Sequence, residues 1–170
     1  MPMPIHFFVA DAQGQAAVVE FIEGRMVAHA GEQLPHKLIT NDTCESSLAF
    51  LAEHKGFGGT KEILKGSHGS LDRFAATADR LKTYRPDGSR QAAIQYAFDT
   101  LAAVRQGKAT KWSIVHDIKD REIHYKTERC DQVRTVRLKD LDFNPKTPVR
   151  MVSINTPHTG LLNPHFADYD

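Results

Sequence analysis

The sequence has few of the features that mark several common classes of protein. Its two cysteines, Cys44 and Cys130, stand far apart and form no C-x-x-C pair, which excludes a disulfide framework and a zinc knuckle. The 22 Lys and Arg residues nearly balance the 21 Asp and Glu residues, and the basic ones are spread along the chain. Without a basic patch to attract phosphates, we expect no nucleic acid as a partner.

Long hydrophobic runs are also missing. No stretch approaches the roughly 20 apolar residues of a membrane-spanning helix, so we expect no membrane partner. The start, MPMPIHFF, has neither the basic nor the apolar region of a signal peptide. We therefore expect a cytoplasmic location by default, with a periplasmic one open if an N-terminal half is missing. The length of 170 residues and an apolar fraction of 41% are typical of one ordinary globular domain.

The first third of the chain predicts short strands followed by a helix. Turn residues and apolar alternation delimit three strands, at residues 5–10, 15–22 and 25–29. Both alternating sets of the middle strand are largely apolar, which predicts a central strand buried on both faces. The stretch LITN, residues 38–41, is expected to be extended, and a helix is expected from Thr43.

The middle of the chain predicts a glycine-rich loop over residues 54–70 and then two helices. An apolar stripe runs along residues 71–83, with Ser70 placed to cap this helix and Pro86-Asp87-Gly88 to stop it. The stripe consists of Leu71, Phe74, Ala75, Ala78 and Leu81. The second helix is expected from about Ser89 to Gln106.

The last part of the chain predicts strands again. Residues 111–118 and 122–127 read as a hairpin, residues 132–138 as a third strand, and residues 149–155 as one more strand-like piece. A run of strands, then helices, then strands favours an α+β fold with antiparallel sheets.

The sequence indicates neither a phosphate loop nor a metal site. The glycines of residues 56–66 lack the G-x-x-x-x-G-K-[ST] spacing. His116 and His124 could face each other across the hairpin, but a catalytic metal needs about three protein ligands and no third one has a suitable spacing. We interpret them as a cross-strand surface pair, and expect no metal and no cofactor.

Three polar residues remain as candidates for chemistry. Cys44 lies near the expected N-terminus of a helix, where a thiolate would be stabilised, but no base can be assigned to it and a packed cysteine is the more common case. Asn41 is either a turn residue or a site residue. Arg73 lies off the apolar stripe of its helix, so it is either a solvated guanidinium or part of a pocket.

Several stretches together resemble the choloylglycine hydrolase and penicillin V acylase family, the linear amide C–N hydrolases of the N-terminal nucleophile superfamily. The resemblance covers about the C-terminal half of such an enzyme, which implies a hydrolase part over residues 1–143 and a proline-containing extension over residues 144–170. It also implies a four-layer αββα sandwich of two antiparallel sheets. The matching pieces are HFFVADAQGQAAVVEF, LITND, GSLDRF and KWSIVHDIKDREIHYKT, followed by the strand that ends in RLKDLDF.

The resemblance also implies roles for two of the candidates. The Asn of the family's L-T-N corner matches Asn41, which would help to hold the tetrahedral oxyanion. The Arg of its S-x-x-R-F helix start matches Arg73, with Ser70 and Phe74 in step, and this guanidinium would lie beside the nucleophile. In the family the nucleophile is an N-terminal cysteine whose own amino group acts as the base.

The sequence departs from the family at the nucleophile, because it begins with Met-Pro and runs straight into the middle hairpin. Two hypotheses follow. The chain is part of an amide hydrolase that acts on a small acyl-amide substrate, together with an N-terminal partner chain or as a homo-oligomer. Alternatively, it is a catalytically inactive remnant that serves as a ligand-binding or structural module.

Overall fold

The computed structural model describes residues 5–85 and 88–169, which form two compact units. The first unit contains the described residues as far as Arg85, with Ala103–Arg105, and the second contains the rest. No helix in the described part of the chain is long and apolar enough to cross a membrane. Pro86 and Asp87 of the expected helix stop lie outside the described residues.

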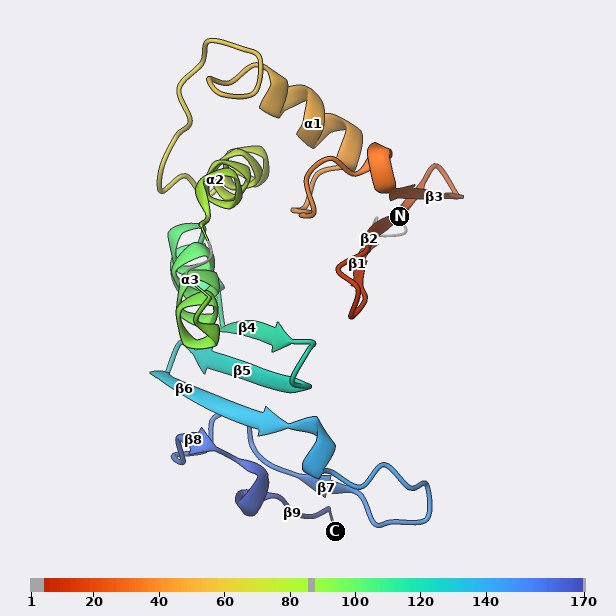
Figure 1. Ribbon diagram of the computed structural model, residues 1–170, viewed down its shortest axis with the longest axis vertical. Coiled ribbons are helices and arrows are strands. Elements are labelled where there is room, and N and C mark those ends of the chain that lie inside the picture. Colours follow the sequence, from red (N-terminus) through yellow and green to blue (C-terminus); the bar gives the residue numbers. More distant parts are fainter. Residues whose placement is uncertain (1–4, 86–87, 170) are drawn as a thin grey trace. The chain divides into compact units, whose positions relative to one another are not determined.

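The first unit contains a three-stranded antiparallel sheet with β2 in the centre (Figure 1). Its strands are β1 (His6–Ala10), β2 (Ala16–Ile22) and β3 (Arg25–Ala30), within one residue of the predicted bounds. Only one face of β2 is buried: Val18 is fully covered, whereas Phe21 on the other face is 47% exposed. The prediction that both faces are buried is wrong, because Leu34 and Cys44 both pack on the Val18 face.

Two helices complete the first unit, α1 (Cys44–Ala52) and α2 (Ser70–Thr83). The helix predicted from Thr43 begins at Cys44, and Thr43 caps it with its hydroxyl accepting from the backbone N–H of Ser46 at 3.2 Å. Leu51 of α1 and Phe74 of α2 are both almost completely buried in one apolar cluster, which fixes the two helices against each other. The stretch LITN, which was expected to be extended, is not part of any strand in the described residues.

The apolar stripe of α2 is confirmed for three of its predicted members, since Phe74, Ala75 and Ala78 are each 1% exposed. Leu81 is 44% exposed, because the last turn of α2 lies beyond the buried cluster. Ser70 is the first residue of the helix rather than its cap, which is Gly69 with no capping side chain. The loop before α2 contains a required glycine, since a Cβ on Gly59 would lie 2.0 Å from the backbone of Glu53.

The second unit contains a four-stranded sheet in the order β4-β5-β6-β8 and a two-stranded sheet of β7 and β9. The predicted hairpin and third strand are confirmed, and β8 adds to β6 in parallel. The predicted strand at residues 149–155 is reduced to the two residues of β7. The elements are α3 (Arg90–Ala103), β4 (Trp112–Asp117), β5 (Glu122–Thr127), β6 (Cys130–Arg137), β7 (Arg150–Met151), β8 (Gly160–Leu161) and β9 (Ala167–Asp168).

Ion pairs hold the start of α3 to the hairpin. The Arg90 guanidinium lies 2.5 Å from the Asp117 carboxylate and 2.6 Å from that of Glu122. His124 is on the same face of the sheet, 5% exposed, and Thr135 Oγ1 lies 3.0 Å from its Nδ1. The predicted surface pair with His116 is wrong, because His116 pairs with Ile123 in the ladder and therefore points to the opposite face.

The described part of the chain thus has a mixed α+β fold with antiparallel sheets and three α-helices, the class predicted from the order of its elements. The boundary at residue 143 between a hydrolase part and an extension stays a prediction.

Candidate functional site

The structure brings the two predicted site residues together at the start of α2. The hydroxyl of Ser70 accepts hydrogen bonds from the backbone N–H of Asn41 at 2.9 Å and from that of Asp42 at 3.0 Å. The same hydroxyl donates to Thr40 Oγ1 at 3.1 Å. Ser70 therefore does not cap its own helix. It fixes to that helix the corner formed by residues 41–44, which carries Asn41.

Arg73 lies one turn further along α2 and contacts the side chain of Asn41. Its Nη2 is 3.5 Å from Asn41 Oδ1, a long hydrogen bond. Because Oδ1 faces the guanidinium, the Asn41 amide nitrogen points away from it and can donate elsewhere. Arg73 is half-buried, and its Nε is covered from solvent without a hydrogen-bond partner among the described residues. The groups that this pair can present to a ligand are therefore hydrogen-bond donors, the Asn41 amide nitrogen and the Arg73 Nε.

The other end of the corner is held by Glu20 on β2. Both carboxylate oxygens accept from the backbone N–H of Cys44, at 3.0 and 3.2 Å. Glu20 is 2% exposed, and histidines on the neighbouring strands flank it: His29 Nε2 lies at 3.0 Å and His6 Nδ1 at 3.5 Å. A buried carboxylate at the N-terminus of α1 is favoured by the helix dipole as well as by the N–H that it accepts.

The thiol of Cys44 is part of the core rather than of a reactive site. The side chain packs against Val18 and Leu34 and is 5% exposed. Burial, and then the negative charge of Glu20, raise the pKa of the thiol. Because the thiolate is the nucleophilic form, both effects work against a catalytic role, in agreement with the packed interpretation.

A cavity of about 170 Å³ opens beside the corner. Asn41, Asp42, Thr43 and Ser46 line one side of it, and residues of β1 and β2 line the other. An engineered cavity of about 150 Å³ accommodates benzene, so this space is large enough for a small ring or a short chain. The lining combines the apolar side chains of Ile5, Phe21 and Ile22 with the polar ones of His6 and Glu20.

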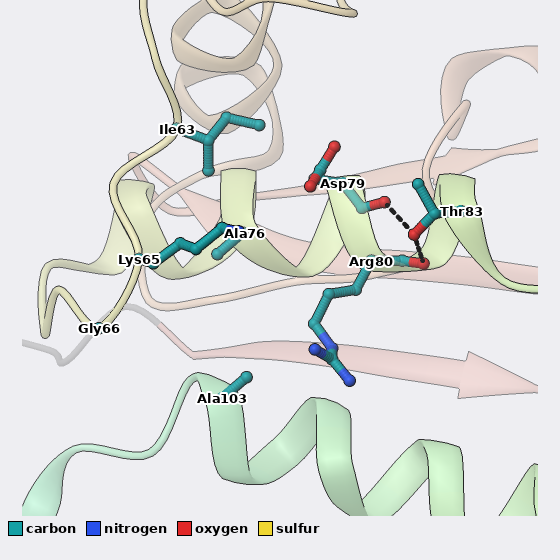
Figure 2. Close-up of a pocket in the computed structure, with 8 residues that line it drawn as sticks. All are labelled: Ile63, Lys65, Gly66, Ala76, Asp79, Arg80, Thr83 and Ala103. Carbon is teal, nitrogen blue, oxygen red and sulfur yellow. Dashed lines mark hydrogen bonds between the residues drawn. The ribbon is translucent and has the colours of Figure 1, made fainter.

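A second cavity, of about 280 Å³, lies between the glycine-rich loop and α2 (Figure 2). In Figure 2, Ile63 and Lys65 come from the loop, while Asp79 and Arg80 come from α2. It shares no lining residue with the cavity beside Asn41. The part of the chain that the structure describes holds no cluster of three His, Cys, Asp or Glu side chains suited to a metal ion.

Of the residues that hold this corner, sequence reasoning noticed Ser70 but assigned it a different role, and it missed Glu20. A signal for Glu20 existed: it is the one charged residue in a strand, AAVVEFI, that otherwise contains only apolar side chains. A charge at such a position is expected to have a buried partner. The catalytic roles of Asn41 and Arg73 stay predictions.

Comparisons with known proteins agree with the predicted resemblance. No family model matches the chain. A penicillin V acylase from Pectobacterium atrosepticum is 22% identical over 167 residues, which cover 84% of this chain and 43% of the relative. The structure of penicillin V acylase from Agrobacterium tumefaciens matches with a TM-score of 0.80 at 24% identity, over 97% of this chain and 56% of that one.

A more distant neighbour has the same fold. A variant of conjugated bile acid hydrolase from Clostridium perfringens matches with a TM-score of 0.64 at 16% identity, over 81% of this chain and 51% of that one. The resemblance predicted from the sequence is therefore confirmed, and the chain has the fold of these hydrolases over part of their length. It spans about half the length of the relatives that it matches.

Proposed function

We propose that the chain is part of a linear amide C–N hydrolase that cleaves N-acyl amides. The observation that carries the proposal is the pairing of Arg73 with Asn41, in which the Asn41 amide oxygen faces the guanidinium and the buried Arg73 Nε has no hydrogen-bond partner among the described residues. Both residues match the positions of the resembled family at which these residue types serve an amide-cleaving site. The partial matches to penicillin V acylase and to conjugated bile acid hydrolase support the same class of reaction.

In this proposal Asn41 stabilises the charge that develops on the scissile carbonyl. Nucleophilic attack on an amide turns the carbonyl oxygen into an oxyanion, and an amide N–H aimed at that oxygen lowers the barrier. Loss of one such donor typically costs a factor of about 10² to 10³ in kcat. Arg73 would orient Asn41 through Oδ1 and favour a neighbouring thiolate through its positive charge.

The nucleophile is proposed to come from residues beyond these 170, on the same polypeptide or on a partner chain. The burial of Cys44 and its raised pKa support this, since the thiol nearest to Asn41 in the sequence is unsuited to attack. The length of the relatives leaves room for such a contribution, because this chain spans only about half of them. The family's mechanism places the thiol and its base on one N-terminal cysteine.

The substrates named for the similar proteins define the panel to test. Penicillin V and conjugated bile acids both contain an acyl group joined to an amine by a linear amide bond. The experiment measures amine release from such compounds and from simple fatty-acid amides. The purified chain is assayed alone and together with the product of an adjacent gene that begins Met-Cys. Activity that needs the added polypeptide and is lost in Asn41→Ala supports the proposal.

A second candidate is a ligand-binding or structural module without turnover. The buried state of Cys44, together with the cavity beside Asn41, favours it as the alternative. Binding of the same amides without amine release, in every combination of chains, would establish this alternative. Turnover by the 170-residue chain alone would refute the proposal that its nucleophile lies elsewhere.

A further inference from the structure

The corner that carries Asn41 is held from two directions by side chains that belong to other elements. Three of its four backbone N–H groups bind such side chains: those of Asn41 and Asp42 bind Ser70, and that of Cys44 binds Glu20. Ser70 is the first residue of α2, and Glu20 lies on β2, the central strand of the sheet. The corner thus bridges the sheet and the helix.

We infer that Glu20 and Ser70 are positioning residues that together fix Asn41 for catalysis. This inference rests on the proposed function. It adds two side chains that act on Asn41 through hydrogen bonds to the backbone on each side of it. The Thr43 hydroxyl caps α1 through the Ser46 N–H, so the helix has an N-terminal hydrogen bond that involves neither Glu20 nor Ser70.

The geometry explains why two supports are needed. Asn41 is exposed and precedes α1 by three residues, so neither the core nor helical hydrogen bonds fix its backbone. Its own side-chain contact with Arg73, at 3.5 Å, is too long to hold it firmly. The Ser70 bonds set the distance between Asn41 and Arg73, since Arg73 follows Ser70 by about one turn of the same helix.

Glu20 contributes rigidity rather than contact with the site residues. Its carboxylate is 2% exposed, and His29 and His6 on the neighbouring strands hold it at 3.0 and 3.5 Å. The N–H of Cys44 therefore binds an acceptor that cannot move without the whole sheet. A misplacement of about 1 Å in a catalytic group can cost about a hundredfold in rate, so small shifts of this corner matter.

Kinetics in two backgrounds test the inference. In the assembled enzyme, we expect Glu20→Met and Ser70→Ala each to lower kcat by about tenfold to a hundredfold with little change in KM. In an Asn41→Ala background the same substitutions should change kcat by less than about twofold, because the group that they position is gone. Equal losses in both backgrounds would show a general structural effect and overturn the inference.

Conservative variants and matched controls sharpen the test. Glu20→Gln and Ser70→Thr keep an acceptor oxygen, so each should recover most of the lost kcat. Glu45→Met changes an exposed glutamate in the first turn of α1, and Thr83→Ala removes a hydroxyl at the end of α2 that binds only backbone oxygens. Both controls should keep the parent kcat. If Glu20→Met does not fold, the Ser70→Ala cycle decides the outcome.

A measurement on the chain alone separates this inference from the proposed function. In Ser70→Ala, NMR should show faster hydrogen exchange at the backbone amides of Asn41 and Asp42 and altered side-chain amide signals of Asn41. Unchanged Asn41 signals in both Ser70→Ala and Glu20→Met would overturn the inference. Changed signals in a protein that hydrolyses no amide in any assembly would refute the proposed function. Only the structural role of Ser70 and Glu20, which hold the backbone around Asn41, would then remain.

Discussion

Arg134 is a buried cation whose partners are backbone carbonyls. It lies on β6 and is 2% exposed; its Nη2 donates to Thr156 O at 2.7 Å and its Nε to His158 O at 2.9 Å. Its guanidinium carbon is 5.7 Å from the centre of the Tyr125 ring. No carboxylate pairs with it among the described residues, and its Nη1 has no hydrogen-bond partner there. We predict that Arg134→Met loosens the segment from residue 156 to residue 162.

The expected loss of stability follows from these contacts. A hydrogen bond from a charged group contributes about 1.5–3 kcal/mol net, so the two bonds together contribute about 3–6 kcal/mol. Methionine also removes the unpartnered Nη1, whose burial costs about 1–3 kcal/mol. Central values of about 4.5 and about 2 kcal/mol for these two contributions give a fall in the free energy of unfolding of about 2.5 kcal/mol. For a chain of this size that corresponds to a decrease in Tm of roughly 5–10 °C.

Thermal unfolding followed by circular dichroism measures the global effect, and hydrogen exchange at the Leu162 amide measures the local one. That amide donates to Thr135 O at 2.8 Å, at the end of the segment that Arg134 holds. Arg129→Met is the matched control, since Arg129 is exposed and should change stability by less than about 0.5 kcal/mol. Parent-like stability of Arg134→Met, with unchanged protection of Leu162, would refute the reasoning.

Three further predictions concern the site and the charged network. Asn41→Asp should lower kcat of the assembled enzyme by about 10² to 10³ without loss of thermal stability, because a carboxylate cannot donate to an oxyanion yet binds Arg73 more strongly; equal kcat would count against the role of Asn41. Cys44→Ser should keep the parent kcat, and in the folded parent a thiol reagent should modify Cys44 far more slowly than after unfolding, because burial and Glu20 raise the pKa of the thiol. Hydrogen bonding from Arg90 holds the pKa of Glu122 below its ordinary value, so the stability that this pairing contributes should be present above about pH 4.3 and lost as the pH falls toward the folded pKa. Denaturant unfolding from pH 7 to pH 3 should show a weaker pH dependence in Glu122→Gln, and identical curves would contradict the assignment.

Local patterns in the sequence predicted the strands and helices well. The alternation of β2 and the stripe that contains Phe74 are properties of neighbouring residues, so the bounds of these elements come out close to those in the structure. The burial of whole faces was harder to predict, because it depends on what covers an element. Phe21 belongs to an apolar strand but lies on the face that Leu34 and Cys44 do not reach.

Contacts between distant segments lay beyond the sequence. The separation of His116 and His124 depends on a ladder register, which a shift of one residue reverses. Ser70 was predicted to cap its own helix, and only the fold shows that its hydroxyl binds the backbone around Asn41, 29 residues earlier. Resemblance to a family was the only means of singling out Asn41 and Arg73 together, since each has an ordinary explanation by itself.

Arg73 and Arg134 show why an unpartnered buried N–H has different meanings in two places. Arg134 already binds two carbonyls and is 2% exposed, so its remaining Nη1 is a cost of the structural role and no ligand can reach it. Arg73 is only half-buried, and its side-chain hydrogen bond among the described residues is a long one to the exposed Asn41. Under the proposed function, the unpartnered Nε of Arg73 binds an acceptor that the described residues do not supply. That acceptor is what a nucleophile or an oxyanion from outside these residues would supply.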